Sequence, residues 1–214
     1  METIKLILEL IYFISGPLLL VVAWKGLKQI IEARNQVEET KKSRVISSRR
    51  EAFKIAAEKC EYYYSHIIPL QNTLYKEIDN KKITFFENSE VVIEGDKILT
   101  KSKYANDEER ELIWELPTLE VFNAMESFAI FFTSGIADEK VAFLTVGNTY
   151  CFSVRRYLPH LMMLSDKGSY KNILALFITW HNRIEKQKLE QEKEKIENKL
   201  SKTTEKTVKP IGTE

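Results

Sequence analysis

The most constraining feature of this 214-residue chain is an uncharged apolar run, Leu10–Trp24. Three more apolar residues precede it, with Glu9 as the only interruption, so the whole stretch has nineteen residues. In a helix that rises about 1.5 Å per residue, this stretch is roughly 28 Å long, close to the ~30 Å hydrocarbon core of a bilayer. Trp24 and Lys25 stand at its far edge, where interfacial residues belong. We therefore expect residues 1–26 to form a transmembrane anchor.

A cleaved signal peptide is the main alternative for this run. Val21-Val22-Ala23 offers small residues at a suitable spacing for cleavage. However, the apolar run abuts that site with no polar region between them, and Lys25 and Lys28 follow at once. The third possibility, a buried core helix, rarely has so long an uncharged run beside a basic flank. These features favour a retained anchor.

The charge on the two sides of the anchor predicts its orientation. Residues 25–50 hold eight Lys or Arg and three Glu, a net charge of +5, whereas the N-terminal flank has only Lys5 beside Glu2. Because cytoplasmic flanks carry the Lys/Arg excess, we expect a single pass through the inner membrane, with the N-terminus outside and the bulk of the chain cytoplasmic. Basic residues next to a bilayer suit anionic lipid head groups. The expected head-group contacts are Lys25, Lys28, Lys41, Lys42 and Arg44.

Composition and motifs exclude several classes of function. A net charge of +1 gives no global attraction to nucleic acid, so we expect none to bind. Cys60 and Cys151 are too few for a disulfide framework or a zinc ribbon, which suits a reducing cytoplasm. The seven glycines form no phosphate-binding loop and no nucleophile elbow, and His160 and His181 stand alone. We therefore expect no cofactor, no metal site and no catalytic residues.

Apolar residues after the anchor recur at three- and four-residue spacings, which is typical of amphipathic helices. The first such stripe runs over residues 52–78, and Pro69 should kink or interrupt it. Ser47-Ser48 should separate it from the anchor helix, because serine favours helix N-caps. Otherwise one very long helix continues to Asp79. Further helices should begin near four residues: Asn106, Pro117, Asp138 and Ser169.

Residues 83–99 change character. Three short β-prone runs are separated by turn-forming pairs such as Gly95-Asp96, which predicts a small hairpin or an extended insertion. The β-prone runs are 83–86, 91–93 and 98–99.

The pattern as a whole predicts a mainly α protein, with an N-terminal transmembrane helix followed by a cytoplasmic helical bundle. After residue 184 the sequence is mostly Glu, Lys and Gln, which indicates a solvated helix and a disordered tail, or alternatively a helix for a partner or a second copy. The expected domains are the anchor 1–26, a basic juxtamembrane helix or linker 27–47, a helical bundle domain 48–184 with the insertion 83–99, and a charged helix and tail 185–214.

Three short segments carry a family resemblance. They are Asn123–Ala129, Gly135–Glu139, and Arg155-Arg156 with Pro159. With them the chain resembles an uncharacterised group of bacterial single-span membrane proteins that have a cytoplasmic helical domain of unknown function. The resemblance covers about residues 45–165. It implies a bacterial origin and a membrane-anchored bundle, and it supplies no activity.

The same segments contain the candidate polar cluster. Asn123 and Glu126 are three residues apart and hence neighbours on one helix face, and Arg155 or Arg156 could pair with Glu126 across the bundle. The cluster either fixes the register of the helices or forms a binding pocket. Its members are Asn123, Glu126, Asp138, Glu139, Arg155 and Arg156.

We expect a membrane-anchored cytoplasmic protein-interaction or scaffold module without catalysis, which binds a protein partner or a second copy. The alternative is a sensor or effector of a bacterial stress or anti-phage system at the inner membrane, and an enzyme of unknown type is third. The alternative requires self-association through the span. Ser15-Gly16 gives a small-residue face there, but the span lacks a G-x-x-x-G motif.

Overall fold

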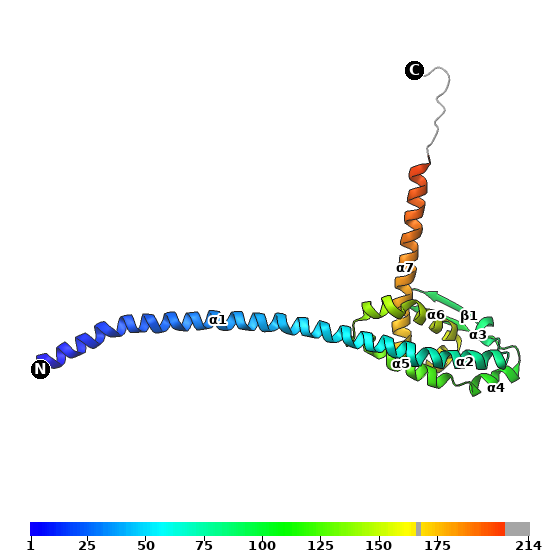
Figure 1. The fold of residues 1–214 in the computed structure, drawn as a ribbon, viewed down its shortest axis with the longest axis horizontal. Helices are drawn as coiled ribbons and strands as arrows, with labels where there is room; N and C mark the ends of the chain where they lie inside the picture. The colour runs from blue at the N-terminus through cyan, green and yellow to red at the C-terminus, as the bar shows by residue number, and fades with distance from the viewer. Residues whose placement is uncertain (166–167, 204–214) are drawn as a thin grey trace, which may run out of the picture. The chain divides into compact units, whose positions relative to one another are not determined.

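The structure is a computed structural model that describes residues 1–165 and 168–203, so the tail predicted for the last residues lies largely outside the described part. It divides into two compact units, Met1–Glu51 and Ala52–Glu214. The described residues are mostly helical with one small antiparallel sheet, which confirms the mainly α class with a small β insertion (Figure 1). The elements in chain order are α1 Glu2–Tyr62, the π-helical turn η1 Tyr63–Ile67, α2 Ile68–Asn80, α3 Phe85–Asn88, β1 Glu90–Glu94, β2 Lys97–Lys101, α4 Asp107–Glu115, α5 Thr118–Thr133, α6 Glu139–Ser165 and α7 Lys171–Lys202.

The first unit is helical throughout. Its apolar stretch has a mean hydropathy of 2.3 over eighteen residues, and none of that window is buried by protein. Among the described residues, the helix that contains it is the one helix long and apolar enough to cross a membrane. The predicted break at Ser47-Ser48 is wrong, because α1 continues through both serines to Tyr62. No proline or glycine lies there to interrupt the helix.

Helical geometry in fact continues through η1 into α2, as the alternative prediction of one long helix required. The π-helical turn stands immediately before Pro69, which has no N–H to donate to the carbonyl one turn earlier. A wider turn accommodates this loss without ending the helix. From Ala52 onward this helix buries one stripe of residues in the second unit. The stripe comprises Ala56, Cys60, Tyr63, Ile67, Leu74 and Ile78.

The two strands form the predicted hairpin, but the first β-prone run predicted before them is not a strand. β1 and β2 pair in register from Glu90 opposite Lys101 to Glu94 opposite Lys97, around a turn in which Gly95 has φ of +58°. The predicted strand 83–86 is wrong, since Phe85 and Phe86 begin the short helix α3 and both are buried. Adjacent residues of a strand point to opposite faces, whereas a helical turn allows both rings to enter the same core.

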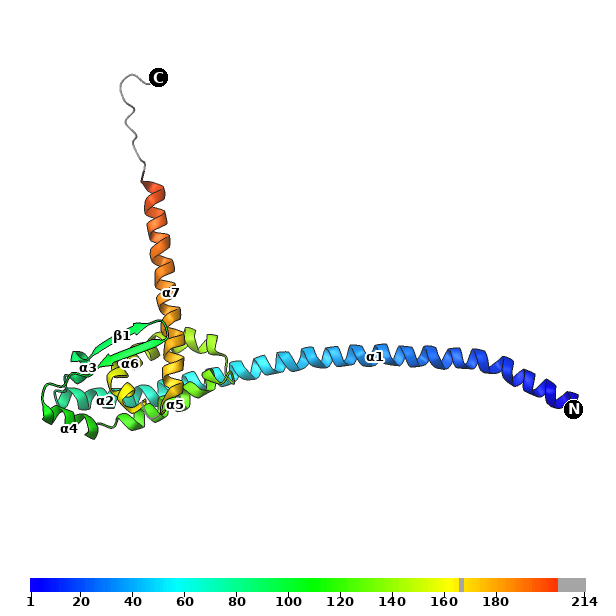
Figure 2. The ribbon, with the colours of Figure 1, turned by 180° about the vertical axis from the view of Figure 1, so that it is seen from behind.

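The core of the second unit is aromatic. Phe128 of α5 is fully buried, and its ring centre lies 5.1 Å from that of Tyr63 and 5.8 Å from that of Tyr150. The Trp180 ring of α7 lies 5.1 Å from that of Tyr150, so rings from α5, α6 and α7 pack together. The ribbons of these three helices lie close to one another in the second unit (Figure 2). Cys60 and Cys151 are buried as reduced thiols. The core therefore holds together without covalent links.

Candidate functional site

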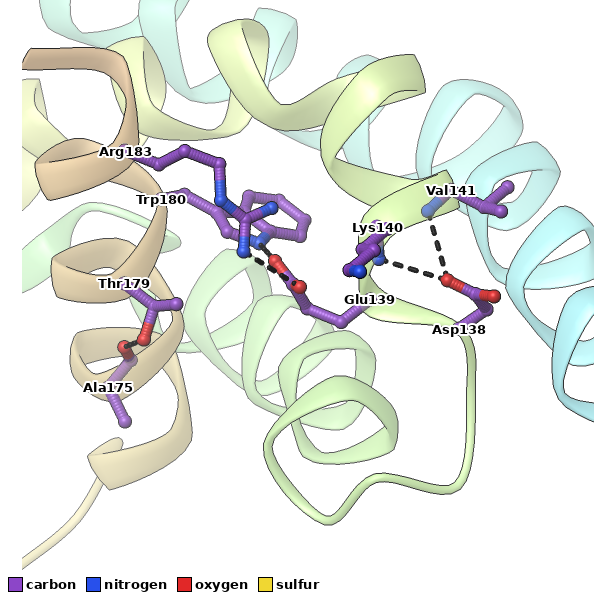
Figure 3. Close-up of polar contacts among 8 residues, drawn as sticks. All are labelled: Asp138, Glu139, Lys140, Val141, Ala175, Thr179, Trp180 and Arg183. Carbon is purple, nitrogen blue, oxygen red and sulfur yellow. Dashed lines mark hydrogen bonds and ion pairs between the residues drawn. The ribbon is translucent and has the colours of Figure 1, made fainter. Parts of the chain in front are cut away.

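Two of the predicted helices are capped by the side chain of the residue that immediately precedes them. Asn106 accepts a hydrogen bond from the Glu109 N–H at 2.7 Å, and Asp138 accepts from Lys140 N–H at 3.0 Å and from Val141 N–H at 3.2 Å (Figure 3). These are the N-cap positions of α4 and α6, as predicted.

Glu139 joins the start of α6 to the middle of α7. Its carboxylate accepts hydrogen bonds from the Trp180 indole N–H and from Arg183 Nη2, the latter at 2.9 Å (Figure 3). The Arg183 guanidinium also lies 4.5 Å from the centre of the Phe143 ring. Sequence reasoning named Glu139 only as a member of the candidate polar cluster. The structure adds two partners on another helix, and these fix the register of α6 against α7.

Glu126 caps a helix to which it does not belong. Its Oε1 accepts from the Asn172 N–H at 3.2 Å and from Asn172 Nδ2 at 2.7 Å, and its Oε2 accepts from the Ile173 N–H at 2.9 Å. A carboxylate at a helix N-terminus satisfies unpaired N–H groups and opposes the positive end of the helix dipole. The predicted pairing of Glu126 with Arg155 or Arg156 is therefore wrong, since both of its oxygens serve α7.

Asn123 supports the same helix start. Tyr170, the residue before α7, has φ of +60°, a conformation that costs a bulky side chain free energy. Its hydroxyl donates to Asn123 Oδ1 at 3.2 Å, and its ring packs edge-on against Phe122. These contacts hold Tyr170 in place, and among the described residues next to it no side chain of its own segment caps α7. α7 thus begins near Ser169, as predicted, but with Tyr170 and not Ser169 at its N-cap position.

Arg155 and Arg156 lie elsewhere, beside a surface groove of about 460 Å³ between α3, β1 and α6. The Arg156 guanidinium stacks 4.5 Å from the centre of the Tyr75 ring and lies 3.9 Å from the Glu87 carboxylate. Arg155 is exposed, and its positive charge contributes to lowering the pKa of Glu185 across on α7, after the stronger hydrogen bond from Lys188. The residues that line this groove include Phe86, Glu87, Val91, Phe152, Arg155 and Arg156.

The six residues predicted as one polar cluster thus occupy three places. Asn123 and Glu126 serve the start of α7, Asp138 and Glu139 serve the start of α6, and the two arginines border the groove. Two of the places hold helices in register, which is one of the two roles that the sequence allowed. Only the third is an open surface that could receive a ligand.

Glu109 is a buried carboxylate that sequence reasoning missed. Its Oε1 accepts from the Thr84 N–H at 2.5 Å and the Phe85 N–H at 3.1 Å, and its Oε2 accepts from the Ala105 N–H at 2.5 Å. Burial alone would raise the pKa of Glu109, but these hydrogen bonds outweigh it and hold the pKa below its ordinary value. A glutamate three residues after the N-cap Asn106 is a capping-box signal, which could have located it.

The buried His160 and the metal-ligating residue types form no candidate site among the described residues. His160 is 1 % exposed and lies against the rings of Phe86, Trp114 and Phe122. Burial lowers the pKa of His160 to about 4, so the ring is neutral at pH 7. In residues 1–165 and 168–203 no three His, Cys, Asp or Glu side chains gather as a metal site would require.

The five predicted lipid contacts all lie on α1 in the first unit, and all are exposed. Lys42 also pairs with Glu38 one turn earlier, at 3.4 Å. An exposed ion pair of this kind contributes little to stability, so it leaves Lys42 available for other anions.

Comparisons with known proteins return no match among protein-family models, curated proteins or solved structures. The resemblance drawn from residues 45–165 therefore stays a prediction.

Proposed function

We propose that this chain is a membrane-anchored protein-interaction module without catalysis. In this proposal residues 1–26 cross the inner membrane of a bacterium once, with the N-terminus outside. The second unit is then a cytoplasmic helical bundle that binds a protein partner, and the anchor determines where it does so.

The observation that carries the proposal is the exposed apolar stretch of α1. An eighteen-residue window with a mean hydropathy of 2.3 has none of its surface buried by protein. Leaving so much apolar surface in water is costly, at about 25 cal/mol per Å². A bilayer removes this cost, and the basic residues that follow fit its anionic head groups.

The surface of the second unit supports the interaction part of the proposal. Phe152 of α6 is 71 % exposed and borders the groove beside the two arginines. Aromatic and arginine side chains together are typical of the energetic centre of protein interfaces.

Site-specific crosslinking in living cells tests this function. A photoreactive amino acid at Phe152 should yield a discrete crosslinked adduct in the membrane fraction. The matched control places the same amino acid at Lys76, which is exposed on α2, and should yield none. A chain that stays uncrosslinked from both positions, or that is recovered in the soluble fraction, would argue against an anchored interaction module.

A further inference from the structure

We infer that the groove between β1 and α6 binds an extended acidic peptide segment of the partner, with carboxylates on Arg155 and Arg156 and an apolar side chain on Phe152. This inference rests on the proposed function and names the chemistry of the partner.

The charge at the groove is only partly neutralised within the chain. Arg155 is exposed and has no ion pair or hydrogen bond within the described residues. Arg156 has Glu87 at 3.9 Å, a long contact to a side chain that is 74 % exposed. An incoming carboxylate can therefore replace Glu87 at little cost, and guanidinium groups bind carboxylates through two parallel hydrogen bonds.

The apolar lining of the groove indicates that its ligand has an apolar part as well as a negative charge. The Phe152 ring is 71 % exposed at its rim, and Phe86 and Val91 line the other side. A small inorganic anion would leave these apolar surfaces in water. A peptide that carries an aromatic or aliphatic residue next to its acidic residues would cover them, and a volume of about 460 Å³ holds only a few such side chains.

The adjacent strand favours a peptide over a lipid head group. In the part of the chain that the structure describes, β1 pairs only with β2, so its second edge keeps unpaired N–H and C=O groups (Figure 2). An extended peptide supplies complementary backbone groups, as in the addition of a strand to an open sheet edge. A lipid head group has no such backbone. A stretch of acidic peptide thus satisfies both the charge and the apolar wall of the groove, and its backbone groups can also pair with those of β1.

Selection from a displayed random-peptide library tests the inference. The full chain is embedded in phosphatidylcholine nanodiscs, and peptides that bind it are sequenced. We expect a consensus of Asp or Glu next to an aromatic or aliphatic residue. Selected peptides should bind Arg155→Gln and Phe152→Ser at least about tenfold more weakly, because each change removes one of the two contacts. Arg155→Lys, which keeps the charge, should retain part of the affinity.

Two control variants match these changes on the same helix. Lys140→Gln removes one exposed positive charge and Leu144→Ser removes one exposed apolar side chain, and neither residue borders the groove. Both should bind the selected peptides like the unchanged chain. The inference is overturned if no peptide is enriched, if the consensus lacks acidic residues, or if Arg155→Gln binds as well as Lys140→Gln.

A lipid ligand would give a different pattern. If Arg155→Gln weakened co-sedimentation of the nanodisc-embedded chain with phosphatidylglycerol vesicles and left peptide binding unchanged, the groove would be a lipid site and the inference wrong. The proposed function fails separately. A crosslinked partner at Phe152 with no acidic consensus removes only the inference, whereas the lack of any crosslink removes the interaction module itself.

Discussion

Two stretches of one continuous helix differ in what surrounds their apolar side chains. In Met1–Glu51 every residue with a described side chain is exposed apart from Gly26, which is half-buried. From Ala52 to Asn80 the same helical path buries a stripe of residues against α5 and α6. Helical backbone geometry is thus common to both stretches, while protein packing stabilises only the second. The comparison teaches that protein covers the apolar side chains of the second stretch only, and under the proposed function a bilayer would cover those of the first.

The largest expected effect is all-or-none and concerns the environment of the first stretch. With one pass and the N-terminus outside, a membrane-impermeant thiol reagent added to intact cells should label Thr3→Cys fully and Lys171→Cys not at all. The native thiols provide the background control, because burial raises the pKa of Cys60 and raises that of Cys151 to about 12, which leaves little reactive thiolate. The reverse labelling pattern would contradict the orientation.

The next effect compares one buried residue with one exposed residue. Phe128→Ala should lower the free energy of unfolding of the second unit by about 3–5 kcal/mol, because it opens a cavity among packed rings. Leu19→Ala, in the exposed stretch, should change it by less than about 0.5 kcal/mol. Urea unfolding in detergent, followed by near-ultraviolet circular dichroism, measures both. Equal losses would remove the distinction between the two stretches.

A pH dependence should arise from the packed region alone. Since the folded pKa of His160 is about 4 and the unfolded value about 6.5, the unfolded chain binds a proton first as the pH falls. Stability should therefore drop between pH 6.5 and 4, by up to about 3 kcal/mol. His160→Phe should flatten this slope, while the control His66→Phe, at an exposed position, should leave it intact. A slope that survives His160→Phe would assign it to other groups.

The smallest effect concerns the cap of α7. Glu126→Gln keeps the shape of the side chain but weakens its bonds to the Asn172 and Ile173 N–H groups, so it should cost about 1–2 kcal/mol. Glu120→Gln, on an exposed face of the same helix, should cost less than about 0.5 kcal/mol. Thermal melting compares the two. If the two variants have the same melting temperature, Glu126 is not a structural cap, and the result would favour a role for Glu126 in ligand binding.

The sequence predicted those features whose cause is local. Asn106 and Asp138 cap helices through N–H groups only two or three residues away, and Gly95 turns a hairpin between strands that touch it. Such short-range chemistry is visible in the order of the residues. The helical periodicity and the long apolar run were visible for the same reason.

The features that sequence reasoning missed have distant partners. Phe85 and Phe86 have β propensity, but the core they enter is built by α4, α5 and α6, which follow them in the chain. Glu126 was matched to arginines by charge alone, whereas its bonds go to backbone N–H groups of α7. Backbone groups of a distant segment carry no sequence signal of their own, so a carboxylate that binds them across the fold cannot be assigned from residue types.

The cap of α7 also bears on how the chain folds as it is made. α7 contains no capping side chain at its first residues, and its acceptor, Glu126, lies 46 residues before Asn172. During synthesis α5 leaves the ribosome first and presents a carboxylate that has no donors yet. When Asn172 and Ile173 emerge, they meet an acceptor already in place, so the beginning of α7 is defined by docking rather than by its own sequence. An isolated peptide of α7 should consequently fray at that end, while the intact chain begins the helix at Lys171.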